Sequence, residues 1–207
     1  MPLDLWLAFA AASAILVAIP GPTVLLVVAY ALGAGRRTAL WTVAGVFLGD
    51  LLAITLSVLG LGVILAASAT LFTALKWAGG AYLIWLGWRL FTAPAEGETI
   101  SARGADKSGR AMLLHAFAVT ATNPKGIVFF VAFLPQFIDP GLPAAPQLAI
   151  MVATFTVIGA ANALVYALAA GTLRKRIRRP SVMRWLNRSG GAALMAMGAA
   201  TILLRRA

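Results

Sequence analysis

The chain has 207 residues, of which 61% are hydrophobic and only 11% are charged, and 17 Lys and Arg against 6 Asp and Glu give a formal net charge of +11. Soluble domains carry roughly 25% charged residues, so this composition excludes an ordinary soluble protein and indicates an integral membrane protein. The positive charge indicates basic cytoplasmic loops rather than nucleic-acid binding, because no basic stretch belongs to a module that could fold in water.

Six apolar stretches are long enough to cross a bilayer as helices, which takes about 20 residues. In chain order they cover residues 3–32, 40–66, 69–91, 111–138, 144–173 and 185–204. We therefore predict an all-α membrane protein with six transmembrane helices in a single domain, 1–207. Two three-helix halves, about 1–91 and 111–207, are joined by a polar cytoplasmic linker at about 92–110. We expect the first span to be retained, since no Lys or Arg precedes it and it continues past the small residues at 10–14.

The loops between the spans alternate in charge. The first, third and fifth contain all the loop lysines and arginines: Arg36, Arg37, Arg103, Lys107, Arg110, Arg174, Lys175, Arg176, Arg178, Arg179 and Arg184. Basic loops stay in the cytoplasm, so both termini are predicted outside and the two halves enter the membrane from opposite sides. Arg205 and Arg206 would favour a cytoplasmic C-terminus instead, but a terminal pair has less weight than three concordant loops.

Two spans are interrupted at matching places. The first contains Pro20-Gly21-Pro22, and the fourth, which opens the second half, contains Asn123-Pro124-Lys125. Proline removes a backbone donor and clashes with the preceding turn, so we predict that helices 1 and 4 are broken there. Paired broken helices in oppositely oriented halves are typical of inverted-repeat transporters, in which freed backbone groups bind polar ligands near the midplane. Simple proline kinks are the alternative.

Asp50 is an acid inside the second span, with apolar sequence on both sides. A carboxylate at that depth costs about 2.5–3.5 kcal/mol on the insertion scale, which makes it a functional candidate. At about 1.5 Å of rise per residue, Asp50, Pro20 and Asn123 each lie roughly 18 Å from the same membrane face. Lys125 lies near this level and could pair with Asp50. Asp50 could act as a proton carrier or as the permanently ionised partner of a cation.

Other residues are secondary candidates. Gly45 and Gly49 form a small-xxx-small face that favours close helix packing, and similar glycine faces elsewhere would also allow a homodimer. Lys76 lies nearer the outer surface. Its side chain could extend outward to the membrane surface, or it could line a permeation path. Asn162 and Tyr166 share one face of the fifth span, where hydrogen bonds between helices are favoured over ligand binding.

Several chemistries lack the residues they need. The chain contains no cysteine, and His115 is its only histidine, just inside the cytoplasmic end of the fourth span. There is no nucleotide-binding loop, catalytic triad or zinc motif. We therefore expect a protein that is not an enzyme and that uses no cofactor and no metal.

The ordered set of motifs resembles the LysE/RhtB family of bacterial amino-acid exporters over nearly the whole chain. The resemblance rests on Pro20-Gly21-Pro22, the segment Gly45 to Asp50, the segment Leu75 to Leu83, Asn123-Pro124-Lys125-Gly126 with Phe129-Phe130, and Leu134-Pro135-Gln136-Phe137. It implies efflux of amino acids or close analogues across the bacterial inner membrane, driven by the proton gradient.

The leading hypothesis is a secondary exporter. The two breaks and Asp50 would line a site in which freed amides hold the carboxylate of a zwitterion and Asp50 holds its ammonium. A membrane scaffold or assembly subunit, whose polar residues only join helices, is the alternative from another class. A small-cation transporter is disfavoured by the single interior acid and single histidine.

Overall fold

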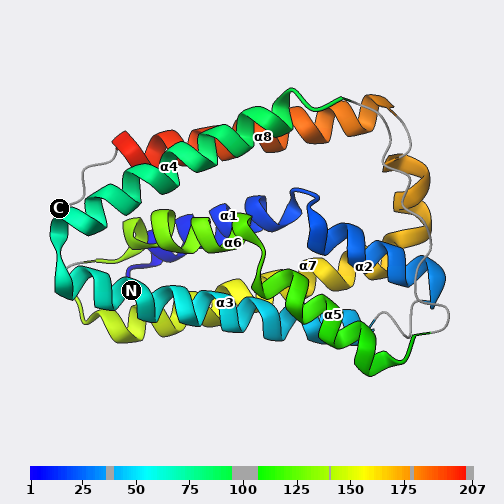
Figure 1. Ribbon diagram of the computed structural model, residues 1–207, viewed down its shortest axis with the longest axis horizontal. Helices are drawn as coiled ribbons and strands as arrows, with labels where there is room; N and C mark the ends of the chain where they lie inside the picture. The colour runs from blue at the N-terminus through cyan, green and yellow to red at the C-terminus, as the bar shows by residue number, and fades with distance from the viewer. Residues whose placement is uncertain (36–39, 95–106, 140, 178–179, 204–207) are drawn as a thin grey trace.

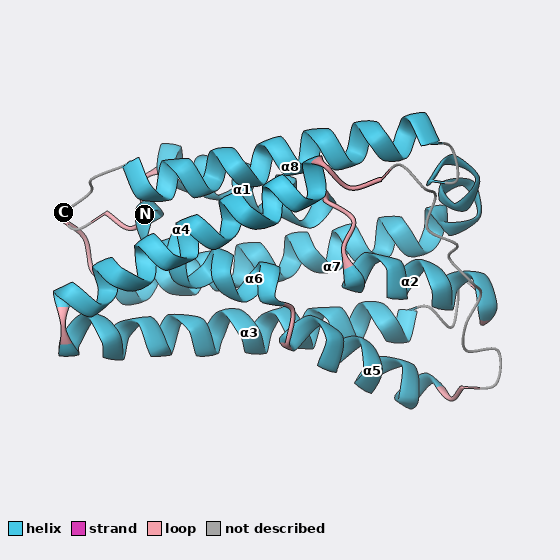
Figure 2. Ribbon diagram, turned by 45° about the horizontal axis from the view of Figure 1, so that its top comes forward, coloured by secondary structure: helices cyan, strands magenta, loops and turns pink. Residues whose placement is uncertain are grey.

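The computed structural model describes residues 1–35, 40–94, 107–139, 141–177 and 180–203, and in this part of the chain regular structure is helical (Figure 2). The elements in chain order are α1 (Leu3–Ala18), α2 (Pro22–Gly33), α3 (Leu40–Ala67), α4 (Ala69–Phe91), α5 (Gly109–Ala121), α6 (Pro124–Val128), the π-helix η1 (Phe129–Phe133), the 3-10 helix η2 (Leu134–Phe137), α7 (Ala144–Ile177) and α8 (Pro180–Leu203). Most of the expected linker, residues 95–106, and the loop arginines at 36, 37, 178 and 179 lie outside the described residues.

The apolar stretches match the helices closely, except around the fifth loop. There α7 continues to Ile177 and α8 already begins at Pro180. Much of the expected basic loop is thus helical, because Lys and Arg are good helix formers and can extend a helix beyond its apolar part.

The helices form an elongated bundle in which the two halves run in opposite directions (Figure 1). The chain follows α1 and α2 along the bundle one way, and α5 and α6 the other way. Helices α2, α4 and α7 run toward the end at which α3, α5 and α8 begin, whereas α1 begins and α8 ends at the opposite end. The connections that the sequence predicts to be basic therefore leave from a common end.

Both predicted breaks are present. The axes of α1 and α2 meet at 57°, and those of α5 and the segment from Pro124 to Phe137 meet at 41°. Two unbroken helical segments, Leu40–Gly62 and Ala144–Gly171, are long and apolar enough to cross a membrane, and each bent pair would add one span.

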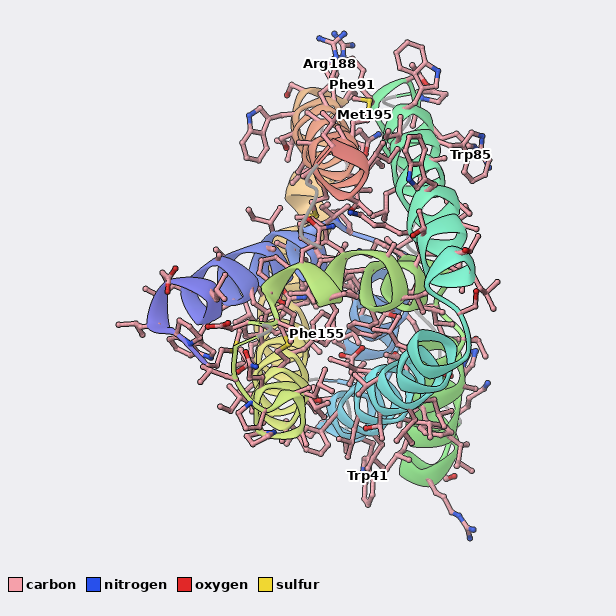
Figure 3. All side chains as sticks on the ribbon, turned by 90° about the vertical axis from the view of Figure 1, so that its left-hand side faces the viewer. Trp41, Trp85, Phe91, Phe155, Arg188 and Met195 are labelled. Atoms are coloured by element: carbon pink, nitrogen blue, oxygen red, sulfur yellow. The ribbon has the colours of Figure 1, made fainter. Side chains whose placement is uncertain are left out.

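Large apolar side chains cover much of the outer surface. Val157 and Val165 on α7 are 62% and 63% exposed. Trp41 and Trp85 are about half exposed and project away from the bundle (Figure 3). In water such a surface would drive aggregation, whereas lipid solvates it. The fold is that of a helical membrane protein.

Glycines allow two pairs of helices to touch backbone to backbone. A Cβ on Gly49 would lie 2.9 Å from the Phe117 carbonyl of α5, and one on Gly191 would lie 2.7 Å from the Phe91 nitrogen of α4. Gly45 packs against α5 in the same way. The small-residue faces are thus occupied by helices of the same chain, which accounts for them without a homodimer.

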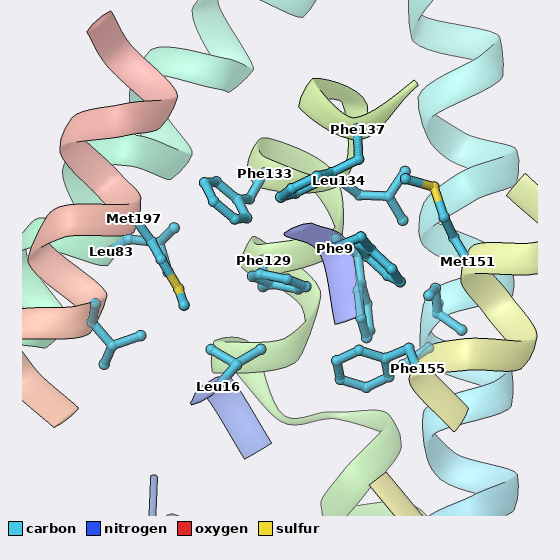
Figure 4. Close-up of a cluster of buried hydrophobic side chains, with 14 of the residues drawn as sticks. Phe9, Leu16, Leu83, Phe129, Phe133, Leu134, Phe137, Met151, Phe155 and Met197 are labelled. Carbon is cyan, nitrogen blue, oxygen red and sulfur yellow. The ribbon is translucent and has the colours of Figure 1, made fainter. Parts of the chain in front are cut away.

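Two buried apolar clusters flank the breaks. One is rich in aromatic rings from α1, η1, η2 and α7, including Phe9, Phe129, Phe133 and Phe155 (Figure 4). The other, between α2, α5 and α7, consists mainly of valine and alanine with Tyr30 and Met112. The polar residues of the breaks lie between these clusters.

We expect Gly191→Ala to lower stability and Gly60→Ala to leave it unchanged or raise it slightly. The methyl group at 191 would force α4 and α8 apart, which costs about 1–3 kcal/mol. A Cβ added to Gly60 on α3 would meet nothing within 4 Å, and alanine is the better helix former by about 0.5–1 kcal/mol. Thermal unfolding of the purified proteins in detergent measures both, and equal effects would contradict the backbone contact.

Candidate functional site

A small cavity lies between the two breaks. Its volume is about 50 Å³, and since one water needs about 10–15 Å³, it has room for only a few waters. Both halves of the chain line it, with Leu16, Val17, Gly21, Thr23, Val24, Val27, Val46, Asp50, Ala53, Thr120, Asn123, Lys125, Gly126, Phe130, Phe155, Gly159, Asn162 and Ala163. Of the residues predicted to lie near one depth, Asp50, Asn123 and Lys125 line this cavity, whereas Pro20 does not.

The carboxyl end of α1 lacks its usual backbone donors. In a continuous helix, the carbonyls of Leu16 and Ala18 would accept from the N–H groups of residues 20 and 22. Both of these residues are prolines and have no N–H. The end of α1 therefore needs donors from elsewhere, because a buried carbonyl without a partner costs about 1–3 kcal/mol.

Side chains of the second half supply these donors. The Lys125 ammonium donates to the carbonyls of Leu16 and Ile19, at 2.9 Å each. On α7, Asn162 Nδ2 donates to the Val17 carbonyl at 3.0 Å and the Tyr166 hydroxyl donates to the Ala18 carbonyl at 2.9 Å. Four successive carbonyls are thus satisfied by three side chains from another part of the fold.

The second break satisfies its own backbone. Pro124 would leave the Thr120 carbonyl without a donor, but the Asn123 N–H turns back to it at 3.1 Å. Thr122 donates both its N–H and its hydroxyl to the Ala118 carbonyl, at 3.1 and 2.7 Å. The Asn123 side chain caps α6 by accepting from the Lys125 N–H at 3.1 Å. The two breaks are alike in place but differ in how they are stabilised.

Polar side chains join the breaks across the cavity. The Thr23 hydroxyl lies 3.4 Å from the Thr120 hydroxyl, and Asn123 Nδ2 donates to Thr23 at 3.4 Å. These long contacts link α2 to α5 and to the start of α6.

Asp50 projects from α3 toward α7 at Gly159. A Cβ at Gly159 would overlap the carboxylate oxygen Oδ2, so this glycine provides the space that the carboxylate occupies. Asp50 and Lys125 both line the cavity. Within the described part of the chain, however, they form no ion pair shorter than 4.0 Å, and the lysine is bonded to α1 instead.

The remaining predicted residues lie around this centre or away from it. Pro20, Pro22 and Pro124 shape the backbone but do not line the cavity, and Tyr166 lies just beyond it. Gly45 and Gly49 serve helix packing. Lys76 is partly buried on α4 and is not among the lining residues.

His115 does not belong to the cavity. Its Nδ1 forms a 2.8 Å hydrogen bond with the hydroxyl of buried Tyr30, between α5 and α2. The described residues contain no group of three or more potential metal ligands among His, Cys, Asp and Glu.

Sequence reasoning missed several lining residues. Thr23 and Thr120 flank the breaks, and Gly159 lies on the same helical face as Asn162 and Tyr166, with spacings of three and seven residues. That spacing was a usable signal for Gly159. The ring of Phe155, packed edge to face on Phe130 at 4.6 Å, carried no comparable signal.

The LysE type translocator family model matches residues 14–205 of the chain. A homoserine/homoserine lactone efflux protein of Salmonella typhimurium is 33% identical over the whole of both chains. An uncharacterized membrane protein of Vibrio cholerae is 35% identical over 96% of each chain. No solved structure matches the chain.

We expect Tyr166→Phe to destabilise the protein and Tyr82→Phe to have little effect. The first change removes the donor to the Ala18 carbonyl, and hydrogen bonds between membrane helices contribute about 0.6–1.7 kcal/mol. The Tyr82 hydroxyl, on α4, makes no hydrogen bond to another described residue, while its ring packs against Trp85 in a similar aromatic setting. Unfolding in detergent at rising denaturant measures the difference, and equal losses would show that the hydroxyl of Tyr166 contributes nothing specific.

Proposed function

Since this chain belongs to the LysE type translocator family, we propose that it exports amino acids or close analogues across the bacterial inner membrane. The observation that carries the proposal is an interior carboxylate, Asp50, lining a cavity at the junction of two broken helices. The homoserine efflux proteins among its relatives support the same class of substrate.

The chemistry of the cavity suits a zwitterion. Asp50 offers a negative charge with no ion pair to compete for it among the described residues, so it can bind the substrate ammonium. The amino end of α2 has no side-chain cap, and Gly21, Thr23 and Val24 at this end line the cavity. Free N–H groups and the positive end of the helix dipole there can hold the substrate carboxylate.

Transport requires the cavity to change shape. A space of about 50 Å³ is too small for most amino acids, so the cavity must widen when a substrate binds. The aromatic cluster borders the cavity on one side through Phe130 and Phe155, and the valine-alanine cluster borders it on the other through Val24 and Ala163. Opening one cluster at a time would give alternating access from the two membrane faces.

We further propose six spans in two inverted halves. The bent pairs form the first and fourth spans, and α4 and α8, with 23 and 24 residues, are long enough to serve as the third and sixth. The basic end of the bundle would then face the cytoplasm, with both termini outside. In this arrangement Asp50 is the carrier of the coupling proton, because an acid beside the substrate can be loaded from either face as the site changes sides.

We expect Asp50→Asn to reduce export at least about tenfold, because the charged contact to the substrate ammonium is worth about 1.5–3 kcal/mol. The matched control is Asp4→Asn, at an exposed acid in the first turn of α1, which should leave export unchanged. Cells loaded with dipeptides are followed for amino-acid release, with and without a protonophore. If wild type accelerates the release of no amino acid, the exporter proposal fails and a scaffold role gains; release that survives the protonophore removes proton coupling alone.

We expect Gly159→Ala to impair export and Gly171→Ala to leave it intact. Both glycines lie on α7, but the added methyl group meets the Asp50 carboxylate at 159 and nothing within 4 Å at 171. The same release assay, with expression levels matched by immunoblot, compares the two. Full export by Gly159→Ala would mean that the position of the carboxylate is not critical.

A further inference from the structure

Among the described residues, Lys125 is the charged side chain bonded to the end of α1, and its ammonium lies between two backbone carbonyls. The Leu16 and Ile19 oxygens accept from it at 2.9 Å each, whereas the two carbonyls between them accept from the neutral groups of Asn162 and Tyr166. The carboxyl end of a helix carries roughly half a negative charge. Backbone oxygens and the helix dipole thus favour a cation at this point.

Small metal cations also bind in this kind of environment. In transporters with discontinuous helices, unwound carbonyls and the carboxyl ends of half-helices coordinate a coupling Na⁺ or H⁺. Hard monovalent cations and primary ammonium groups both suit a set of converging carbonyl oxygens. Here a covalently attached ammonium takes the place that a free ion would otherwise fill.

We propose that Lys125 is a built-in cation, which occupies a carbonyl site for a small monovalent cation and makes the protein independent of Na⁺. Removal of its charge therefore creates a binding site for Na⁺ or for a primary alkylammonium ion. An ammonium has three N–H donors, of which the carbonyls use two. The third remains for a group in the cavity, so Lys125 positions the end of α1 relative to the bound substrate.

The role in transport rests on the proposed export function, but the cation site does not. The first experiment therefore measures thermal unfolding of purified protein in detergent, in chloride salts of Na⁺, propylammonium and choline at equal ionic strength. Propylammonium matches the part of the side chain that Lys125→Ala removes, and choline is too bulky for the site. Tyr166→Phe is the matched control, since it removes a neutral donor from the same helix end and keeps the lysine.

We expect Lys125→Ala to unfold about 2–4 °C or more higher in Na⁺ or propylammonium than in choline, as for a ligand that binds only the folded state. Wild type and Tyr166→Phe should show no such difference. Equal unfolding temperatures of Lys125→Ala in the three salts would overturn the proposal. An unfolding temperature of wild type that is higher in Na⁺ or propylammonium than in choline would overturn the proposal as well, because the site would then be open while the lysine is present.

A second variant and a second readout cover poor folding of the alanine protein. Lys125→Met keeps most of the side-chain volume without the charge, so it should gain the Na⁺ dependence but not the propylammonium dependence. In proteoliposomes, wild-type export should be equal in Na⁺ and choline, and propylammonium should restore part of the export lost in Lys125→Ala. Export by wild type that requires Na⁺ would overturn the built-in cation, whereas absence of any export would count against the proposed function only.

Discussion

The centre of this protein depends on hydrogen-bond donors that α1 lacks. Pro20 and Pro22 end the helix within the apolar part of the protein, where a carbonyl left without a donor is costly. Lys125, Asn162 and Tyr166 supply the donors. This fixes the position of α6 and α7 against α1 and places the cavity beside the break. The polar residues are therefore not isolated insertions in an apolar sequence, because each donates to a backbone carbonyl at the end of α1.

The sequence predicted the helices and the breaks well, because both are properties of one segment at a time. Apolar length located the helices to within a few residues, and proline located the bends. It predicted less well which side chains meet, since that depends on how each helix is rotated. Lys125 was expected beside Asp50, and it does lie at the same cavity, but its hydrogen bonds go to α1. Gly159 leaves space for the Asp50 carboxylate because it has no side chain. This role can be recognised only once the packing of α3 against α7 is known.

The polar interior combines two roles that the sequence left as alternatives. Asn162 joins helices through the Val17 carbonyl and also lines the cavity. Thr23 and Asn123 likewise contact each other across the breaks while facing the same space. In a membrane protein a polar group without a partner is costly. A residue that lines the cavity is therefore less costly when it also bonds another helix in the absence of a ligand. One residue can therefore both form a hydrogen bond between helices and contact a ligand.

The two breaks differ in one respect that bears on how the sequence can change. At the break before Pro124, the free carbonyls accept hydrogen bonds from residues only a few positions away. Substitutions elsewhere in the chain therefore leave these hydrogen bonds in place. The break at Pro20 and Pro22 depends on residues more than a hundred positions away along the chain. A substitution that restores an N–H at residue 20 or 22 would lessen the need for a donor to the Leu16 or the Ala18 carbonyl, whereas loss of Lys125 or Tyr166 would make the proline more costly. The prolines and their distant donors are therefore energetically coupled, so a substitution at one of them changes the free-energy cost of a substitution at another.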